Sequence, residues 1–390
     1  DIVPNHMAAS SDNPYWMDVL ESGSASPFAP WFDIDWNHPK EALKNKVLLP
    51  VLGAPFGRVV ENGDLVLAID DHGFLVNYHE NKLPVSIESY RLILSYQLDS
   101  LESMLGSGDG AVREIREIIH DVGCLSSASK PEAAPVDHEL SDEQIAAAAT
   151  AKERLLRLYK NSADAKRFID ANLIAFNGKP GDPGSFSLLE KLLDQQHYRL
   201  SFWRLANEEI NYRRFFTISD LVGIRVEDPG IFTETHALFK QWVAGGVATG
   251  IRVDHIDGLR DPADYLRRLQ KYLASARVPG SADKPALKPL YIVVEKILAE
   301  GESLRPDWPV SGTTGYDFLN TLNGVFIKPE GVLELTKIYD RFIGSEVSFE
   351  DIVHKKKILV METLLGGEMR SLGSMLGRLA EKDRYARDLP

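Results

Sequence analysis

Two short segments, Gly250-Ile251-Arg252-Val253-Asp254-His255 and Tyr291-Ile292-Val293-Val294-Glu295-Lys296, decide the fold class. Each is a mostly aliphatic run that ends in an acid. Such runs are typical of strands that are covered on both faces, as in a parallel α/β sheet. These sheets carry catalytic groups at the C-terminal ends of their strands, so the sequence predicts that Asp254 and Glu295 lie close together.

A pair of carboxyl groups in this arrangement has a recognisable chemistry. Arg252 stands two residues before Asp254, and a neighbouring guanidinium favours an ionised carboxylate, whereas an apolar environment raises the pKa of a carboxylic acid. An ionised nucleophile and a proton donor about 5 Å apart break and remake glycosidic bonds with retention of configuration. We therefore predict Asp254 as nucleophile and Glu295 as acid/base. Taken singly, either acid could instead cap a helix or pair with a surface lysine.

Three motifs, in this order, resemble those of the α-amylase superfamily of glycoside hydrolases. They are Asp1-Ile2-Val3-Pro4-Asn5-His6, Gly250 to His255, and the strand end Val294-Glu295. The resemblance implies that Asn5 and His6 line the sugar site. It also implies that Arg252 orients the nucleophile and that His255 contacts the donor sugar. Without the family, His6 could equally be a helix-capping or loop residue.

A closer resemblance, to the maltooligosyltrehalose synthase family, covers nearly the whole chain. The segments that carry it are Phe32 to Trp36, Phe202 to Arg204, Ile210 to Phe216, Leu221 to Pro229, Gly250 to Leu259 and Gly312 to Phe318. This resemblance implies isomerisation of the reducing-end α-1,4 bond of maltooligosaccharides to an α,α-1,1 bond. It also implies a separate trehalose-releasing hydrolase as functional partner, and no cofactor is expected. Superfamily analogy suggests calcium near Asn5, but the several-oxygen cage that calcium requires is not legible in the sequence, so no metal is predicted. An α-glucan hydrolase of the α-amylase type would share the same arginine and acid pair and remains an alternative.

The fold that the resemblance implies is an incomplete TIM (β/α)8 barrel of the α-amylase type with a large mixed, mostly helical insertion. Residues 1–8 would end the third strand, 246–327 would hold strands four and five with their crossover helix, and 328–390 would form a helical segment. The stretch 9–245 is far too long for a strand-to-helix loop, so it must hold an inserted subdomain of its own. Its expected parts are strand-rich at about 46–86 and helical at about 88–245.

Local signals within the insertion predict particular elements. Asn62-Gly63 lies between apolar runs, which suggests a β-hairpin. Ser141 is a plausible N-cap of a helix that extends to about Leu173, and 188–210 shows helical apolar spacing. The stretches 126–138 and 278–289 are rich in Pro and small residues and are predicted to be loops.

One expected feature of the superfamily is missing. A third acid should follow in a later His-Asp motif, and no such motif occurs after Glu295. Asp317 belongs to the separate segment Gly312 to Phe318 and is not assigned that role. The chain opens at Asp1 inside the first motif, so the opening barrel units are expected to be absent. We therefore expect an internal fragment, inactive alone, with the third acid outside it; a non-catalytic glucan-binding fragment is the second alternative.

Composition limits the function classes further. Hydrophobic residues make up 44% of the 390, which suffices for a sizeable core. The net charge of −13 disfavours nucleic acid and suits an uncharged glucan, although acidic proteins are also simply soluble. No apolar run reaches the length of a membrane span. The single cysteine, Cys124, permits no internal disulfide, and a cytoplasmic location is expected.

Aromatic residues and arginines near the motifs are the remaining candidates for sugar contacts. Sugars present apolar faces that stack on rings, and Trp36 and Tyr212 are candidates for subsite walls, although aromatic side chains are more often core. One of Arg213 and Arg214 could donate hydrogen bonds to sugar hydroxyls. An ion-pair network is the alternative role for these arginines.

Overall fold

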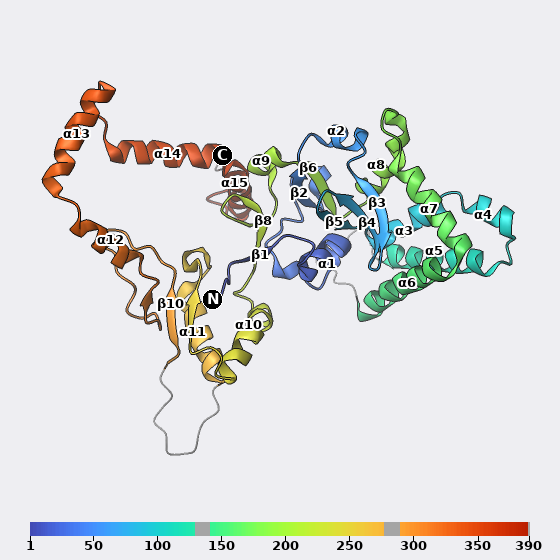
Figure 1. Cartoon of the computed structure of the whole chain (residues 1–390), viewed down its shortest axis with the longest axis horizontal. Coiled ribbons are helices and arrows are strands. Elements are labelled where there is room, and N and C mark those ends of the chain that lie inside the picture. Colours follow the sequence, from blue (N-terminus) through green and yellow to red (C-terminus); the bar gives the residue numbers. More distant parts are fainter. Residues whose placement is uncertain (129–140, 277–288, 389–390) are drawn as a thin grey trace, which may run out of the picture. The chain divides into compact units, whose positions relative to one another are not determined.

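The computed structural model describes residues 1–128, 141–276 and 289–388, which fall into two compact units. One unit comprises Asp1–Met7 and Gly223–Glu362, and the other comprises Ala8–Val222 and Thr363–Pro390. The chain passes from the first to the second within strand β1 (His6–Ala8). Figure 1 labels most of the elements of both units.

The unit that contains both acids is organised around parallel strands. Strands β9 (Gly250–Val253), β10 (Tyr291–Val294) and β11 (Gly312–Thr313) form a parallel sheet in the order β11-β10-β9. Ile2 extends the sheet beyond β9 through a parallel bridge to Val253. Helix α11 (Pro262–Ala274) connects β9 to β10 (Figure 1). The predicted parallel strand-helix-strand unit is therefore confirmed.

Helices on the sheet bury its aliphatic side chains. Helix α10 (Pro229–Ala244) precedes β9, and Asp228 caps it by accepting hydrogen bonds from the Gly230 and Ile231 N–H groups. Helix α11 is capped in the same way by Asp261. The core between helices and strands includes Val253, Ile292, Val294, Leu266, Leu269 and Leu273, each without measurable exposure. Burial of each such side chain contributes about 1.5–3 kcal/mol and fixes where the strands end.

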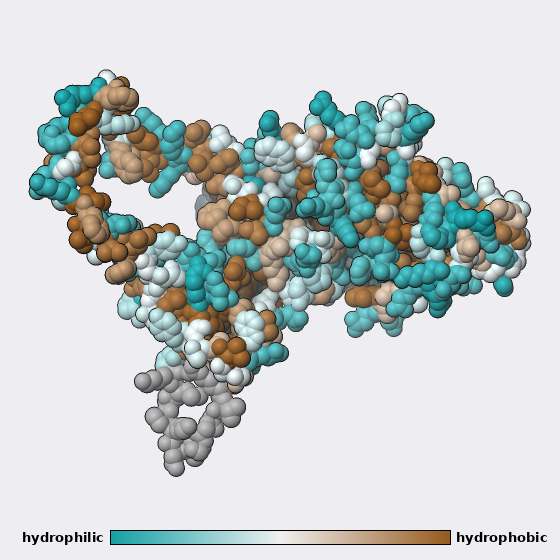
Figure 2. Space-filling model, viewed as in Figure 1, coloured by the Kyte–Doolittle hydropathy of each residue, from teal (hydrophilic) through white to brown (hydrophobic). Residues whose placement is uncertain are grey.

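Three further helices of this unit have little packing. They are α12 (Tyr316–Val325), α13 (Pro329–Ile343) and α14 (Phe349–Thr363), and none of their described residues is buried. Phe326 is 81% exposed, Phe342 is 88% exposed and Phe349 is 73% exposed. Figure 2 shows apolar residues along these helices. The apolar stripes that make the helices amphipathic therefore face outward.

The second unit contains a parallel pair and an antiparallel meander. Strand β2 (Val47–Leu52) pairs in parallel with β6 (Tyr198–Phe202). Strands β3 (Val66–Asp70), β4 (Gly73–Tyr78) and β5 (Asn81–Pro84) form the meander. Strands β7 (Arg214–Phe215) and β8 (Ile218–Gly223) form a further antiparallel pair.

The Asn-Gly hairpin prediction is wrong, because Asn62-Gly63 ends helix α2 (Phe56–Glu61). The Asn62 N–H donates to the Arg58 carbonyl, and Gly63 has a φ of +75°. An Asn-Gly pair satisfies a helix C-terminus as well as it satisfies a hairpin, since both require left-handed backbone. The hairpin lies one strand later, where Asp70 pairs with Gly73 across the β3–β4 turn.

Helices make up most of the rest of this unit. They are α1 (Pro14–Ser22), α3 (Tyr90–Ser95), α4 (Leu98–Leu105), α5 (Gly110–Ala128), α6 (Asp142–Asn161), α7 (Ala163–Asn177), α8 (Ser187–Asp194), α9 (Ala206–Glu209) and α15 (Gly366–Ala380). The predicted N-cap Ser141 is confirmed: its side chain accepts from the Gln144 N–H, and the Gln144 side chain accepts from the Ser141 N–H. The predicted helix is two helices, because Ser162 ends α6 and caps α7.

The helix predicted over 188–210 is interrupted: α8 ends at Asp194, and helix resumes only in the 3-10 turn Trp203–Leu205 and in α9. Residues Tyr198–Phe202 form β6 instead, and Tyr198 and Leu200 are buried beside β2. Pairing with a buried strand outweighs local helical spacing.

Most of the predicted 126–138 loop and nearly all of the predicted 278–289 loop lie outside the described residues. Residues 126–128 end α5.

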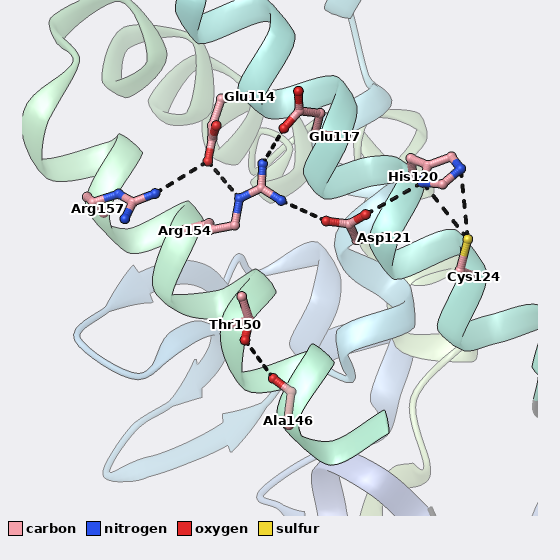
Figure 3. A network of polar contacts seen from close by, with 9 residues as sticks. All are labelled: Glu114, Glu117, His120, Asp121, Cys124, Ala146, Thr150, Arg154 and Arg157. Atoms are coloured by element: carbon pink, nitrogen blue, oxygen red, sulfur yellow. Dashed lines mark hydrogen bonds and ion pairs between the residues drawn. The ribbon is translucent and has the colours of Figure 1, made fainter. Parts of the chain in front are cut away.

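One arginine joins helices α5 and α6. Arg154 on α6 donates to Glu114 at 2.8 Å, to Asp121 at 2.7 Å and to Glu117 at 2.6 Å, all on α5 (Figure 3). Its side chain is only 20% exposed.

Cys124, the only cysteine in the sequence, is exposed one turn beyond His120 on α5. Among the described helices, none combines the length and the apolar character that a membrane span requires.

Candidate active site

The two predicted acids lie at adjacent strand ends. Val253 and Val294 are direct partners in the β9–β10 ladder, so Asp254 and Glu295 are the next residues on neighbouring strands. The Asp254 N–H donates to the Ile2 carbonyl and the Glu295 N–H donates to the Val253 carbonyl, both at 2.8 Å. These backbone bonds position both acids, whose side chains are 21% and 24% exposed.

Arg252 contacts both acids. Its Nη2 lies 3.0 Å from Asp254 Oδ1 and 3.3 Å from Glu295 Oε2. Its Nη1 lies 2.9 Å and 2.8 Å from the two carboxylate oxygens of Asp1. One guanidinium is therefore held among three carboxyl groups.

Glu295 receives two further donors. The His255 N–H donates to Glu295 Oε2 at 3.2 Å, and the Tyr316 hydroxyl reaches Glu295 Oε1 at 3.4 Å. Tyr316 is the first residue of α12 and belongs to the segment Gly312 to Phe318. The sequence argument did not assign Tyr316 a role. The signal that could have found it is a tyrosine directly after the next parallel strand.

The acids also affect one another. Burial raises the pKa of Asp254 above its ordinary value, and the hydrogen bond and charge of Glu295 add to this effect. The hydrogen bond from Asp254 lowers the pKa of Glu295, and the His255 N–H, Arg252 and Tyr316 act in the same direction. When the free pair holds a single proton, that proton therefore lies on Asp254. This is the reverse of the protonation that an Asp254 nucleophile and a Glu295 acid need at the moment of attack.

Asn5, His255 and Gly258 are closely packed beside the pair. The Asn5 side-chain amide donates to the Gly258 carbonyl at 2.7 Å, and Asn5 is 4% exposed. His255 has a φ of +46°, which is uncommon for a residue other than glycine. A Cβ on Gly258 would lie 2.5 Å from His255 Nε2 and 2.8 Å from Asn5 Nδ2. Gly258, which the sequence argument overlooked, is therefore required for this packing.

A lysine connects the two loops that follow the acids. Lys296 Nζ lies 3.2 Å from Asp257 Oδ2 and 3.0 Å from Glu302 Oε1. The side chain of Lys296 is 16% exposed. The contact to Asp257 joins the loop after β9 to the residue that follows Glu295. No sequence pattern had marked Lys296.

The other predicted sugar contacts fall in different places. His6 is half-buried in β1, in the same unit as the acids. Trp36 and Tyr212 belong to the other unit. Trp36 is half-buried, whereas Tyr212 is 4% exposed, packs its ring against Trp16 and donates its hydroxyl to the Ser219 carbonyl at 2.8 Å.

Both arginines of the Arg213-Arg214 pair form ion pairs, as their alternative interpretation has it. Arg213 Nε lies 2.7 Å from Asp33 Oδ2. Arg214 Nε lies 2.8 Å from Glu368 Oε1, and the Arg214 side chain is 1% exposed.

Within the described part of the chain, no group of three or more His, Cys, Asp or Glu side chains is placed to hold a metal ion.

The fold and the site define a mixed α/β protein that carries, at the ends of neighbouring parallel strands, a carboxyl pair of the type that retaining glycosidases use. No family model matches the chain. The chain is 28% identical over 386 residues to a putative maltooligosyl trehalose synthase of Mycobacterium tuberculosis strain CDC 1551 / Oshkosh. The aligned region covers 98% of this chain and 34% of that protein.

Solved structures give the same result. Maltooligosyltrehalose synthase from Arthrobacter ramosus matches 97% of this chain and 34% of its own, with 28% identity and a TM-score of 0.60. A hypothetical maltooligosyl trehalose synthase from Sulfolobus tokodaii matches 97% of this chain and 35% of its own, with 25% identity and a TM-score of 0.58. The chain thus resembles maltooligosyltrehalose synthases along nearly its whole length and spans about a third of the length of these relatives.

Proposed function

We propose that this chain carries the nucleophile and the acid/base of a glucan isomerase, which converts the reducing-end α-1,4 bond of a maltooligosaccharide to an α,α-1,1 bond. The observation that carries the proposal is the contact of Asp254 and Glu295 at adjacent strand ends, bridged by Arg252. Two carboxyl groups this close suit a retaining mechanism, because an inverting enzyme needs room between them for water. The names of the relatives supply the substrate class.

The scaffold for this chemistry is, by the same proposal, part of a TIM barrel of the α-amylase type. Four parallel segments lie side by side in chain order: the residues around Ile2, then β9, β10 and β11. Sequential parallel neighbours with an intervening helix are the repeating unit of a barrel. The first segment would be the third strand, and β9 and β10 the fourth and fifth.

In the first step Glu295 gives its proton to the glycosidic oxygen while an Asp254 oxygen attacks the anomeric carbon. The C–O bond breaks, the terminal glucose leaves with the proton, and the remaining glucan is esterified to Asp254. A substrate oxygen that enters between the two carboxyls removes their mutual hydrogen bond, which is the largest cause of the lowered pKa of Glu295. The proton then moves to Glu295, while Arg252, 3.0 Å from Asp254, favours the ionised nucleophile.

In the second step the released glucose stays in the site and turns. Glu295, now ionised, accepts the proton of its anomeric hydroxyl, and that oxygen attacks the glucan carbon held on Asp254. The ester bond breaks and an α,α-1,1 bond forms, with net retention. Water must be excluded during the turn, because its attack would give hydrolysis. Asn5, His6 and His255 would hold the donor sugar.

By itself the 390-residue chain is proposed to be inactive. It spans about a third of the length of its relatives, and no His-Asp motif follows Glu295 to supply a third acid. The outward-facing apolar stripes of α12, α13 and α14 are consistent with packing against further protein. A separate hydrolase that releases trehalose from the product completes the proposed reaction sequence.

The test uses a full-length protein that contains this chain, with maltopentaose as substrate. Wild type should consume reducing ends and should yield trehalose after a trehalose-liberating hydrolase is added. Asp254→Asn and Glu295→Gln should each reduce the rate by about 10²- to 10⁴-fold. Glu300→Gln, which changes an exposed acid five residues beyond Glu295, is the matched control and should keep the wild-type rate.

Each other outcome has a defined meaning. A gain of reducing ends would show an α-glucan hydrolase and would refute isomerisation, while leaving the acid pair in place. Full activity of Asp254→Asn would refute the assignment of the nucleophile. Activity of the isolated 390-residue chain would refute its proposed dependence on further protein.

A further inference from the structure

A pocket that the acid pair does not line lies between helices α10 and α11. It has a volume of about 330 Å³ and is lined by Phe232, Thr233, Arg268, Lys271, Tyr272 and Ser275. All of these residues belong to the two helices that cover the sheet, except Ser275, which caps α11, whereas Asp254 and Glu295 follow the strand ends. The proposed reaction uses none of them.

The floor and wall of the pocket are aromatic. Phe232 is 2% exposed, and its ring meets the Tyr272 ring edge to face at 5.5 Å. The Tyr272 hydroxyl donates to the Thr233 carbonyl at 3.3 Å, which fixes the ring between the helices. Ring walls of this kind offer apolar contact to a flat or ring-shaped ligand.

The charged residues of the pocket are cationic. Arg268 lies over the Phe232 ring at 5.3 Å, and it is held there by hydrogen bonds to Asp264 Oδ2 at 2.8 Å and to the Glu227 carbonyl at 2.9 Å. Lys271 lines the pocket one turn away and is exposed. Lys240 adds a third cation, with its ammonium group 4.4 Å from the centre of the Tyr272 ring.

A local cluster of cations is unusual for a chain with a net charge of −13. Arg268 is ion-paired with Asp264 at 2.8 Å, so the positive charge offered to an anion comes mainly from Lys271 and Lys240. An arginine has five N–H donors, so the protein contacts of Arg268 still allow it to donate to a ligand. We propose that this pocket binds a small phosphate monoester that carries a ring, such as a sugar phosphate or a nucleotide. The phosphate lies between Lys271 and Arg268, and the ring lies against Tyr272.

The experiment is calorimetric titration of the 390-residue chain with AMP, glucose 6-phosphate, orthophosphate and maltose. One AMP or one glucose 6-phosphate should bind per chain, at least roughly fivefold more tightly than orthophosphate, and any binding of maltose at the separate glucan site should be unchanged in Tyr272→Leu. The stronger of the two ring-bearing ligands identifies the ring that the pocket prefers. This result does not depend on the proposed isomerase, since binding is measured without the reaction.

Three variants test the residues. Lys271→Gln should weaken the ring-bearing phosphate roughly tenfold, because one charge-assisted hydrogen bond is lost. Tyr272→Leu should remove most of its advantage over orthophosphate. Arg267→Gln changes an exposed cation of the same helix that does not line the pocket, and it is the matched control, expected within about twofold of wild type.

Three results would overturn the proposal. The first is no saturable binding of any phosphate to a chain that unfolds cooperatively. The second is an equal loss of affinity in Lys271→Gln and Arg267→Gln, which would show attraction by general surface charge. The third is maltose binding as tight as that of glucose 6-phosphate and weakened by Tyr272→Leu, which would make the pocket a neutral saccharide site.

Discussion

The glycine that packs beneath the site offers a sharp test of its geometry. Gly258 ends the short 3-10 turn Ile256–Gly258 that follows Asp254 and His255. An alanine there would place its Cβ 2.5 Å from His255 Nε2 and 2.8 Å from Asn5 Nδ2. Atoms at these separations overlap, so either ring or amide must move. Both groups are predicted to contact the donor sugar.

The cost of Gly258→Ala can be estimated from this overlap. Overpacking of a well-filled site typically destabilises by about 1–3 kcal/mol. His255 already holds a φ of +46°, so its backbone has little freedom to adapt. A shift of about 1 Å in a positioning group can reduce a rate by about 10²-fold. We therefore expect kcat/KM to fall about 100-fold, together with a decrease in Tm of a few degrees.

The assay is the loss of maltopentaose reducing ends in the full-length protein, with Tm measured in parallel. Gly57→Ala is the control, because a Cβ on Gly57 in α2 meets nothing within 4 Å. It should leave activity unchanged, and stability unchanged or raised by up to about 1 kcal/mol. Activity of Gly258→Ala within threefold of wild type would refute the claim that this glycine positions His255 and Asn5.

Three further predictions follow from side-chain environments. Tyr316→Phe removes a hydrogen bond that lowers the pKa of Glu295. The pKa of Glu295 should therefore rise, and the alkaline limb of the pH–activity profile should move to higher pH. An unchanged pH–activity profile would contradict a hydrogen bond from Tyr316 to Glu295. Burial lowers the pKa of His236 from 6.5 to about 4. The free energy of unfolding should therefore fall by up to about 3 kcal/mol as the pH decreases from 6.5 to 4, because the unfolded chain binds the proton more readily. In denaturant titrations, His236→Gln should flatten this pH dependence. Arg154→Met leaves three carboxylates of α5 without their shared cation. This variant should destabilise the chain by about 1–3 kcal/mol at pH 7 but by less at pH 4, where carboxylates are partly protonated. Equal losses of unfolding free energy at pH 7 and pH 4 would exclude carboxylate repulsion as the cause.

The parallel strands and their terminal acids could be predicted because their causes are local in sequence. The aliphatic runs before Asp254 and Glu295 must be buried on both faces, and α11 between them has clear capping and periodicity signals. The errors lie where local signals are ambiguous. Asn62-Gly63 fits a helix end and a hairpin equally well, and 198–202 has helical spacing but finds a strand partner in β2.

The residues that sequence reasoning missed act through contacts that are distant along the chain. Tyr316, Lys296 and Gly258 lie in three separate segments of the chain, and the role of each is defined by the residues that it contacts. A tyrosine, a lysine or a glycine in isolation carries no signal of such contacts. Tyr212 illustrates the converse: it lies among aromatic residues that suggested a sugar platform, yet its ring and hydroxyl are used inside the protein.

The proton of the acid pair is the property least accessible to sequence. The identities of Asp254 and Glu295 predict that one is ionised and the other protonated, but the assignment depends on donors from several segments: Arg252, the His255 N–H and Tyr316. All three favour an ionised Glu295 in the free protein. The mutual hydrogen bond of the acids is the one contact that a substrate must replace, because the scissile oxygen has to lie between them. When the pair holds a single proton, substrate entry therefore has only to transfer that proton from Asp254 to Glu295 to give the protonation that the first step needs.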